Sequence, residues 1–352
     1  MSTVRPDNPV TEDEVATGDL VPDPRTTRSA SSVKSWAAQN YRQIILFGTF
    51  ALMILIFSLA KPSAFLTATN IHNLVNAMPV LTMMAIGVTV VLVLGEFDLS
   101  VPNVASLAAV VIGVLSTQTS FGLIVALVLG AVVVGLAAGA VNGTAVGYGR
   151  APAFIVTLAV GSICAGIELL VQSKIHLGQT SIAVSSIPTS LQNLTLKHFL
   201  GFDLTVWVVL IIAAIVGSAM VLTPWGRHVH AIGGNETAAR LAGVPVRRTK
   251  VSAFMLTGLL AGIAGMLFTS GNGYFANALT PYLLPAYAAA FFGAAGVGRR
   301  GFSVPATLFG ALYLSTLTNG LTVLNEPLWV ASVVQGVVLF VAVLMARLGQ
   351  RS

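Results

Sequence analysis

Charged residues are scarce in this chain, and their scarcity excludes an ordinary soluble domain. Only 9% of the 352 residues are charged and 55% are hydrophobic, whereas a soluble globular domain has roughly 25% charged residues. The net charge of +6 does not indicate a nucleic-acid-binding surface, because basic residues beside membrane spans have a different cause. The composition predicts a polytopic membrane protein with no nucleic-acid partner.

Cysteine and catalytic motifs are also nearly absent. The one cysteine, Cys164, lies in an apolar run and cannot form an internal disulfide, so we interpret it as a small buried hydrophobic residue. The chain contains no G-x-x-x-x-G-K-[ST], H-E-x-x-H or G-x-S-x-G motif. These absences exclude ATP binding in the P-loop manner and predict no catalytic residue, metal or cofactor.

Ten apolar runs recur along the chain at lengths suited to a bilayer core of about 30 Å. They are continuously apolar instead of alternating, which favours helices over a β-barrel. Five spans in each half mean that any internal repeat must be inverted, although no sequence repeat is obvious. The chain is therefore predicted to be an all-α polytopic membrane protein with about ten transmembrane helices, at about 44–60, 78–94, 101–116, 122–146, 153–171, 205–223, 252–270, 283–297, 303–320 and 328–346.

Basic residues divide unequally between the two sides of these spans. With the N-terminus inside, all 18 Lys and Arg residues except Lys61, Lys174 and Lys197 lie on the cytoplasmic side. Because short cytoplasmic loops are enriched in Lys and Arg, both termini and the segment 224–251 are predicted to be cytoplasmic.

The ends and connections differ in composition from the spans. Residues 1–35 are rich in Pro, Thr, Ser and Asp and predict a disordered cytoplasmic tail, followed by a transmembrane domain over 36–348. The largest external connection covers 172–204. It is either a plain linker or a contact for an external partner.

The segment 224–251 contains a short helix whose two ends are marked in the sequence. Asn235 is a good N-cap, Glu236 places a negative charge in the first turn, and Gly243 follows the last helical residue. The predicted helix, 236–242, is too short to be stable alone in water. We interpret it as a docking element.

An acidic stretch, GEFDLSVP at 95–102, interrupts the apolar pattern between the second and third runs. Asp98 or Ser100 can cap the third span. Glu96 is not needed for that cap. The alternatives are a simple cap or a helix break buried in the protein, whose polar groups face a polar pathway.

A second interrupted segment, GNGYFANALTPY at 271–282, precedes the eighth run. It matches the first break in its place within the half, and paired breaks are expected where discontinuous helices line a substrate path. The residues predicted for such a path are Glu96, Asp98, Asn103, Asn272, Tyr274 and Asn277.

Glu168 lies near the end of the fifth run. An acid in hydrocarbon costs about 2.5–3.5 kcal/mol on insertion scales, so this side chain should face the bundle interior or the external interface. Its closeness to the boundary favours the interface.

Three stretches resemble the permease subunits of bacterial ATP-binding-cassette sugar importers of the ribose/xylose/arabinose type. GEFDLSV at 95–101 resembles the family's Gly-Gly-Ile-Asp-Leu-Ser-Val-Gly signature, and APAFIVTLAVGSICAGI at 151–167 its Pro-Phe-Ile-Ala-Thr-Leu-Gly segment. GRHVHAIGGNETAARLAGVPVRRTKVSAF at 226–254 resembles its block around Ala-Ile-Gly-Gly-Asn. In length and span order the similarity covers about residues 40–348.

The resemblance implies a permease in the bacterial plasma (inner) membrane that imports a monosaccharide or polyol and is not itself an enzyme. Its implied partners are separate ATPase subunits, an extracytoplasmic solute-binding protein, a second permease copy and membrane lipid. The short helix would be the coupling helix that contacts the ATPase, through Arg227, Asn235, Glu236, Ala239, Arg240 and Gly243.

Departures from the family pattern and rival functions remain. Glu96 and Phe97 stand where Gly-Ile is usual, and Pro102 stands where Gly is usual. Branched-chain amino-acid permeases share a similar Asp-Leu-Ser stretch, so an amino acid is an alternative solute. An ion-coupled secondary transporter predicts ionisable residues deep in the spans, and an intramembrane enzyme predicts a catalytic constellation that the sequence lacks.

Overall fold

Helices make up nearly all regular structure in this protein. The computed structural model describes residues 28–118, 122–175, 181–296 and 301–348. Its elements are α1 (Arg28–Ala60), α2 (Ala68–Val93), α3 (Val101–Gln118), α4 (Leu123–Leu127), the π-helix η1 (Val128–Val134), α5 (Gly135–Gly147), α6 (Ala153–Ile175), β1 (Ser181–Ile182), η2 (Val184–Ser186), α7 (Thr189–Leu196), β2 (His198–Phe199), β3 (Phe202–Asp203), α8 (Leu204–Leu222), α9 (Pro224–Gly234), α10 (Glu236–Leu241), α11 (Val246–Asn272), β4 (Tyr274–Phe275), η3 (Thr280–Tyr282), α12 (Leu283–Gly296), α13 (Val304–Val323) and α14 (Leu328–Leu348).

Each predicted apolar run coincides with a helix or with the continuous segment formed by α4, η1 and α5. Six helical segments of the described chain are long and apolar enough to cross a membrane, at 43–60, 68–93, 123–147, 153–173, 204–222 and 246–272. Shorter apolar helices lie at 101–117 and 329–341. The chain is thus an all-α polytopic membrane protein, while ten crossings and an inverted repeat stay predictions.

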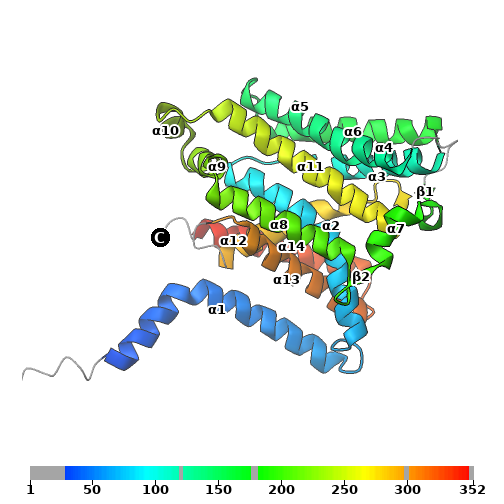
Figure 1. Cartoon of the computed structure of the whole chain (residues 1–352). Helices are drawn as coiled ribbons and strands as arrows, with labels where there is room; N and C mark the ends of the chain where they lie inside the picture. Colours follow the sequence, from blue (N-terminus) through cyan, green and yellow to red (C-terminus); the bar gives the residue numbers. More distant parts are fainter. Residues whose placement is uncertain (1–27, 119–121, 176–180, 297–300, 349–352) are drawn as a thin grey trace, which may run out of the picture.

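Helix α11 runs through the middle of the bundle and packs against α5, α3 and α2 (Figure 1). Glycine allows the closest of these contacts. A Cβ placed on Gly139 of α5 would lie 2.4 Å from the carbonyl oxygen of Phe254, and one placed on Gly258 of α11 would lie 2.2 Å from that of Gly135. Small residues let two membrane helices approach this closely, so packing explains part of the high glycine content.

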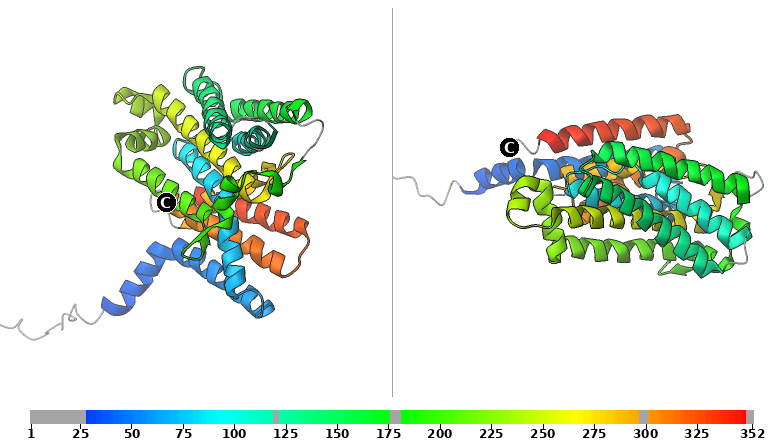
Figure 2. Two further views of the ribbon diagram at one scale, coloured as in Figure 1. Left: turned by 45° about the vertical axis from the view of Figure 1, so that its right-hand side comes forward. Right: turned by 90° about the horizontal axis from the view of Figure 1, so that it is seen from above.

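Helix α1 begins, and α14 ends, at the end of the bundle that carries α9 and α10 (Figures 1 and 2). Most of the tail predicted for 1–35 lies outside the described residues. Helix α1 begins at Arg28, ahead of the predicted domain boundary at residue 35, and that boundary stays a prediction. Ser, Ala and Lys in this stretch tolerate a helix and extend it ahead of the apolar run.

The opposite end of the bundle carries the short strands and α7 (Figure 1). Strand β1 pairs antiparallel with β4, so Ile182 lies opposite Tyr274. Strands β2 and β3 form a second antiparallel pair immediately before α8. The described part of the predicted connection 172–204 is therefore folded, and it lies against the predicted path segment 271–282.

Candidate functional site

Helix α10 has the two ends that the sequence predicts. The side-chain oxygen of Asn235 accepts a hydrogen bond from the backbone N–H of Ala238 at 3.0 Å. At the other end Gly243 has φ +80°, and the N–H groups of Gly243 and Val244 donate to the carbonyls of Arg240 and Ala239. These bonds form a Schellman motif, in which glycine takes the left-handed conformation at least cost.

The same type of stop ends α2, directly beside α9. Gly95 has φ +84°, and the N–H of Glu96 donates to the carbonyl of Val91 at 3.0 Å. A Cβ placed on Gly233 of α9 would lie only 1.9 Å from the carbonyl oxygen of Val93. The end of α2 and the α9–α10 segment are therefore in close backbone contact, which holds α10 near the connection that follows α2.

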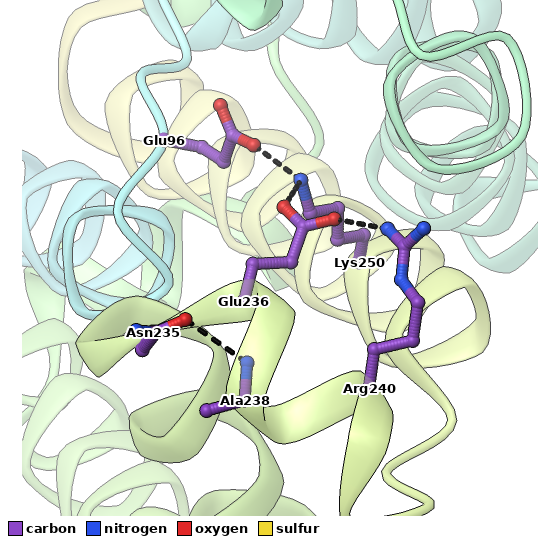
Figure 3. A network of polar contacts seen from close by, with 6 residues as sticks. All are labelled: Glu96, Asn235, Glu236, Ala238, Arg240 and Lys250. Carbon is purple, nitrogen blue, oxygen red and sulfur yellow. Dashed lines mark hydrogen bonds and ion pairs between the residues drawn. The ribbon is translucent and has the colours of Figure 1, made fainter.

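Four charged side chains gather at this contact and form what we call the ion network: Glu96, Glu236, Arg240 and Lys250 (Figure 3). The Lys250 ammonium lies 2.6 Å from Oε1 of Glu96 and 2.9 Å from Oε2 of Glu236. The guanidinium of Arg240 lies 2.6 Å from Oε1 of Glu236, one helical turn away. Two acids and two bases thus join the α2–α3 connection, α10 and the first turns of α11.

Burial in the ion network is uneven. The Lys250 side chain is 9% exposed, while those of Glu96 and Glu236 are 22% and 39% exposed. A buried ammonium is costly unless it is paired, and here it has two carboxylate partners. The hydrogen bond from Lys250 lowers the pKa of Glu236, and Arg240 acts in the same direction. Glu236 is therefore ionised throughout the physiological pH range.

The outer surface of α10 suits a protein partner. Ala239 is buried against the bundle, whereas Thr237, Ala238 and Leu241 are exposed. Leu241 is 85% exposed, which is unusual for a large apolar side chain on a short polar helix. An apolar side chain presented on a fixed, capped helix can insert into a groove of another protein.

The structure separates some of the predicted coupling residues. Asn235, Glu236, Ala239, Arg240 and Gly243 all belong to α10 and its caps. Arg227 lies on α9, where its guanidinium reaches the carbonyl of Leu222 at 3.5 Å, and it does not join the ion network. The preceding helix α9 was not predicted, although Thr223 and Pro224 are a typical N-cap and first helical residue.

The predicted path residues also fall at two ends of the molecule. Glu96 lies in the ion network, whereas Asn272, Tyr274 and Asn277 follow α11 at the β1–β4 end. The 27 residues of α11 span about 40 Å at 1.5 Å per residue. Asn103 lies between these ends, on the first turn of α3, with its amide close to Gly161 of α6. The structure therefore does not bring Glu96 and the 271–282 segment together.

Asp98 organises the buried connection before α3. Its carboxylate accepts hydrogen bonds from the backbone N–H of Ser100 at 3.0 Å and from the Ser100 hydroxyl at 2.5 Å. Asn142 of α5 donates to that hydroxyl, and the Asp98 backbone N–H donates to the hydroxyl of Tyr287 in α12. The helix break is thus buried among several helices, and Asp98 stabilises the turn that starts α3.

A second buried acid occupies the β1–β4 end and forms what we call the Glu168 cluster: Glu168, Gln172, Tyr274 and Asn277. The Tyr274 hydroxyl and the Asn277 backbone N–H donate to Oε1 of Glu168, and Gln172 donates to the Tyr274 hydroxyl at 2.5 Å. Glu168 is 1% exposed, so the interface position favoured by its sequence location is wrong. Its Oε2 oxygen is buried without a hydrogen-bond partner.

Lys250 and Glu168 are the charged residues whose positions the sequence patterns did not predict correctly. The predicted run begins at 252, so Lys250 falls in the cytoplasmic segment 224–251, although it lies in the first turns of α11. The sequence does contain a signal for this pairing. Lys250 lies next to a span, and Glu96 and Glu236 are predicted on the same side of the membrane. Within the described residues, no three His, Cys, Asp or Glu side chains gather as a metal site would require.

Comparison with known proteins gives one consistent result. Residues 70–343 match the family described as "Branched-chain amino acid transport system / permease component". The chain is 31% identical to the ribose import permease protein RbsC of Escherichia coli K12, over 91% of this chain and 98% of that protein. It is 33% identical to RbsC of Bacillus subtilis 168, over 85% and 91% of the two chains. It is 27% identical to the xylose transport system permease protein XylH of E. coli K12, over 87% and 92%. No solved structure matches the chain.

Proposed function

The chain belongs to this family of permease components, as a multi-pass permease subunit and not an enzyme, and we propose that it imports a monosaccharide through an ATP-binding-cassette system. The curated relatives named for ribose and xylose, together with the L-arabinose ABC transporter permease of Azospirillum brasilense, support a sugar. The name of the matching family keeps a branched-chain amino acid as the alternative solute.

Helix α10 is the proposed coupling helix. The observation that carries this assignment is a two-turn helix capped at both ends, presenting Leu241 outward and tied to the bundle by Lys250. Force applied to α10 by a moving ATPase reaches α11 and the α2–α3 connection through the ion network. Rocking of the helices about a path between them would then expose the solute to alternate sides.

The proposed orientation places α10 and both termini in the cytoplasm. Support comes from the distribution of Lys and Arg and from the shared position of α1's start, α14's end and α10. A cysteine introduced at Thr237 in a Cys164→Ala background should resist an impermeant thiol reagent in intact cells. Labelling at that position would show that α10 faces the outside and that the proposed orientation is wrong.

The assembly would contain separate ATPase subunits, an extracytoplasmic solute-binding protein and a second copy of this permease. Exposed apolar side chains such as Leu52, Ile163 and Ile211 are available to lipid or to that second copy. The connection 172–204, whose described part is folded, is the proposed contact for the binding protein. Cross-linking in native membranes tests whether a second permease copy is present. The expected product is a permease dimer that contains neither the ATPase nor the binding protein.

The polar groups proposed to line the solute route are those of the buried connection around Asp98, with Glu96 and Asn103, and those at the β1–β4 end, including Asn272, Tyr274 and Asn277. Hydroxyl, amide and carboxylate groups are suited to a polyhydroxy solute. In this proposal Glu96→Gln impairs transport and leaves insertion and ATPase binding intact. Wild-type uptake at equal protein level would remove Glu96 from the route.

The deciding experiment is reconstitution of the permease with an ATP-binding-cassette ATPase and a solute-binding protein from its source organism. Uptake of labelled ribose, xylose and arabinose is measured with leucine as competitor. Glu236→Lys and Gly243→Val should lower uptake and solute-stimulated ATP hydrolysis together, while the free binding protein keeps its affinity for the solute. Full hydrolysis and full uptake in the doubly substituted chain would refute the role of α10, and leucine competition would favour the alternative solute.

A further inference from the structure

A basic pocket of about 350 Å³ lies beside α10, between the α5–α6 turn and the start of α11. Four cationic side chains line it, Arg150, Arg240, Arg247 and Lys250, against two acids, Glu96 and Glu236. A Cβ placed on Gly147 at the end of α5 would lie 3.0 Å from the carbonyl oxygen of Arg247, so the two helix ends are in close contact. This contact brings Arg150 and Arg247 to one pocket.

Two of these cations lack an acidic partner. Lys250 and Arg240 occupy both acids in the ion network. Among the described residues, no carboxylate oxygen lies within 4.0 Å of the guanidinium of Arg150 or Arg247. Arg247 instead stacks over the ring of Tyr148, 5.6 Å from its centre. The pocket therefore carries a net charge of +2, from Arg150 and Arg247.

The backbone at Arg150 is also unusual. Arg150 has φ +54°, in the left-handed region that costs a side chain of this kind about 1 kcal/mol or more. Arg150, which has this unfavourable backbone conformation, is one of the arginines that line the pocket. An unfavourable backbone conformation at a binding surface is a common sign that the side chain is positioned for a ligand.

We propose that this pocket receives an acidic side chain of the ATPase that docks on α10, with Arg150 and Arg247 binding its carboxylate. The inference rests on the proposed function, since it assumes that α10 docks an ATPase. Glu236 and Arg240 belong to both α10 and the pocket, so a protein covering Leu241 also covers the pocket. Guanidinium groups bind carboxylates in a planar, two-bonded geometry.

An exposed apolar side chain next to the pocket favours a protein carboxylate over a free phosphate anion. The exposed Leu241 beside the pocket adds an apolar contact that a protein can use and a free anion cannot. An anionic phospholipid headgroup, which basic pockets between membrane helices also bind, is the competing occupant.

The test measures association of the full-length permease, in nanodiscs, with the ATPase that supports uptake in the reconstituted system. Arg150→Glu/Arg247→Glu should weaken association at least tenfold at 0.1 M salt, with the difference shrinking at 0.5 M salt because screening increases. The single variant Arg247→Glu is measured as well, and Arg248→Glu is its matched control, because it makes the same charge change at the next residue, which does not line this pocket. The Arg248→Glu control should change association less than twofold. Comparable melting temperatures show that the variants are folded.

Two further arms separate the failures. Leu241→Glu tests α10 docking itself: if association survives it, the proposed function fails, whatever the arginines do. If Leu241→Glu abolishes association and the arginine pair has no effect, only the pocket inference is overturned. Nanodiscs of neutral lipid alone should support the same association as nanodiscs with 30% phosphatidylglycerol. If the arginine substitutions change only the response to phosphatidylglycerol, the pocket holds a lipid headgroup and the inference is wrong.

Discussion

The two ends of α11 hold carboxylates in opposite ways. In the ion network, Glu96 and Glu236 are partly exposed and each contacts a cation. In the Glu168 cluster, the carboxylate is 1% exposed and its hydrogen-bond donors are a hydroxyl and a backbone N–H, both neutral. The partly exposed carboxylates of the ion network can be reached by water, whereas a buried acid with neutral donors depends on fixed geometry. The contrast suits a moving coupling element at one end and a rigid, shaped polar surface at the other.

Removing the central cation should have the largest effect. Lys250→Met leaves two neighbouring carboxylates without their shared partner, and we expect a loss of about 1.5–3 kcal/mol in the free energy of unfolding, because charged hydrogen bonds are lost at a mostly buried site. Thermal unfolding of the purified permease measures it. The matched variant Glu96→Gln/Lys250→Met should be more stable than the sum of its single changes predicts. Strict additivity would mean that the two side chains do not interact.

Substitutions of Glu168 test whether the Glu168 cluster depends on fixed hydrogen-bond geometry. Glu168→Leu leaves the Tyr274 hydroxyl and the Asn277 N–H without their acceptor, and an unsatisfied buried donor costs about 1–3 kcal/mol. Glu168→Gln retains an acceptor oxygen and should lose less than half as much. Unfolding of the two variants in the same detergent gives the comparison. Equal losses would show that the charge of Glu168, and not its acceptor geometry, matters at this end.

A backbone change at α10 should act locally. Gly243→Ala forces a side chain into the left-handed region and should cost about 1 kcal/mol, whereas Gly243→Asn should cost less because Asn tolerates that conformation. Hydrogen exchange should increase at the amides of α10 and remain unchanged in α11. An equal increase in both helices would indicate that α10 does not move separately from the bundle.

The smallest effect is the pH dependence of Glu236. Its pKa is below the ordinary value of 4.5, because Lys250 donates to its ionised form. A carboxyl with a lowered folded-state pKa stabilises the protein above the unfolded-state pKa, and this contribution disappears as pH falls through the folded-state value. The difference in melting temperature between wild type and Glu236→Gln should thus be constant from pH 7 to 5 and shrink below pH 4.5. A difference that does not shrink as the pH falls below 4.5 would contradict the assignment.

The local features of this protein were predictable because they depend on neighbouring residues. Asn235 and Gly243 mark the ends of α10 through hydrogen bonds within the helix and the residue after it. The helices that cover the apolar runs follow from those runs, and the break at 95–100 follows from its polar residues and Gly95. Cys164 is buried, as its apolar run predicts. Asn319 and Gln335 hydrogen-bond to side chains of neighbouring helices, which is the usual role of an isolated amide in a span.

The contacts that define the two sites depend on the tertiary structure. Glu96 and Lys250 are separated by 154 residues. The hydrophobic periodicity of the sequence does not indicate which distant residues will form a pair. Glu168 is only near a boundary in the sequence, but Tyr274 and Asn277 fold over it and bury it. The amino-acid sequence by itself therefore determined where the helices form and where α10 begins and ends, because helix formation and capping depend on interactions between residues close in the sequence. Which acid meets which donor was decided by helix packing, because close approach at glycines such as Gly233 sets distances that no local pattern encodes.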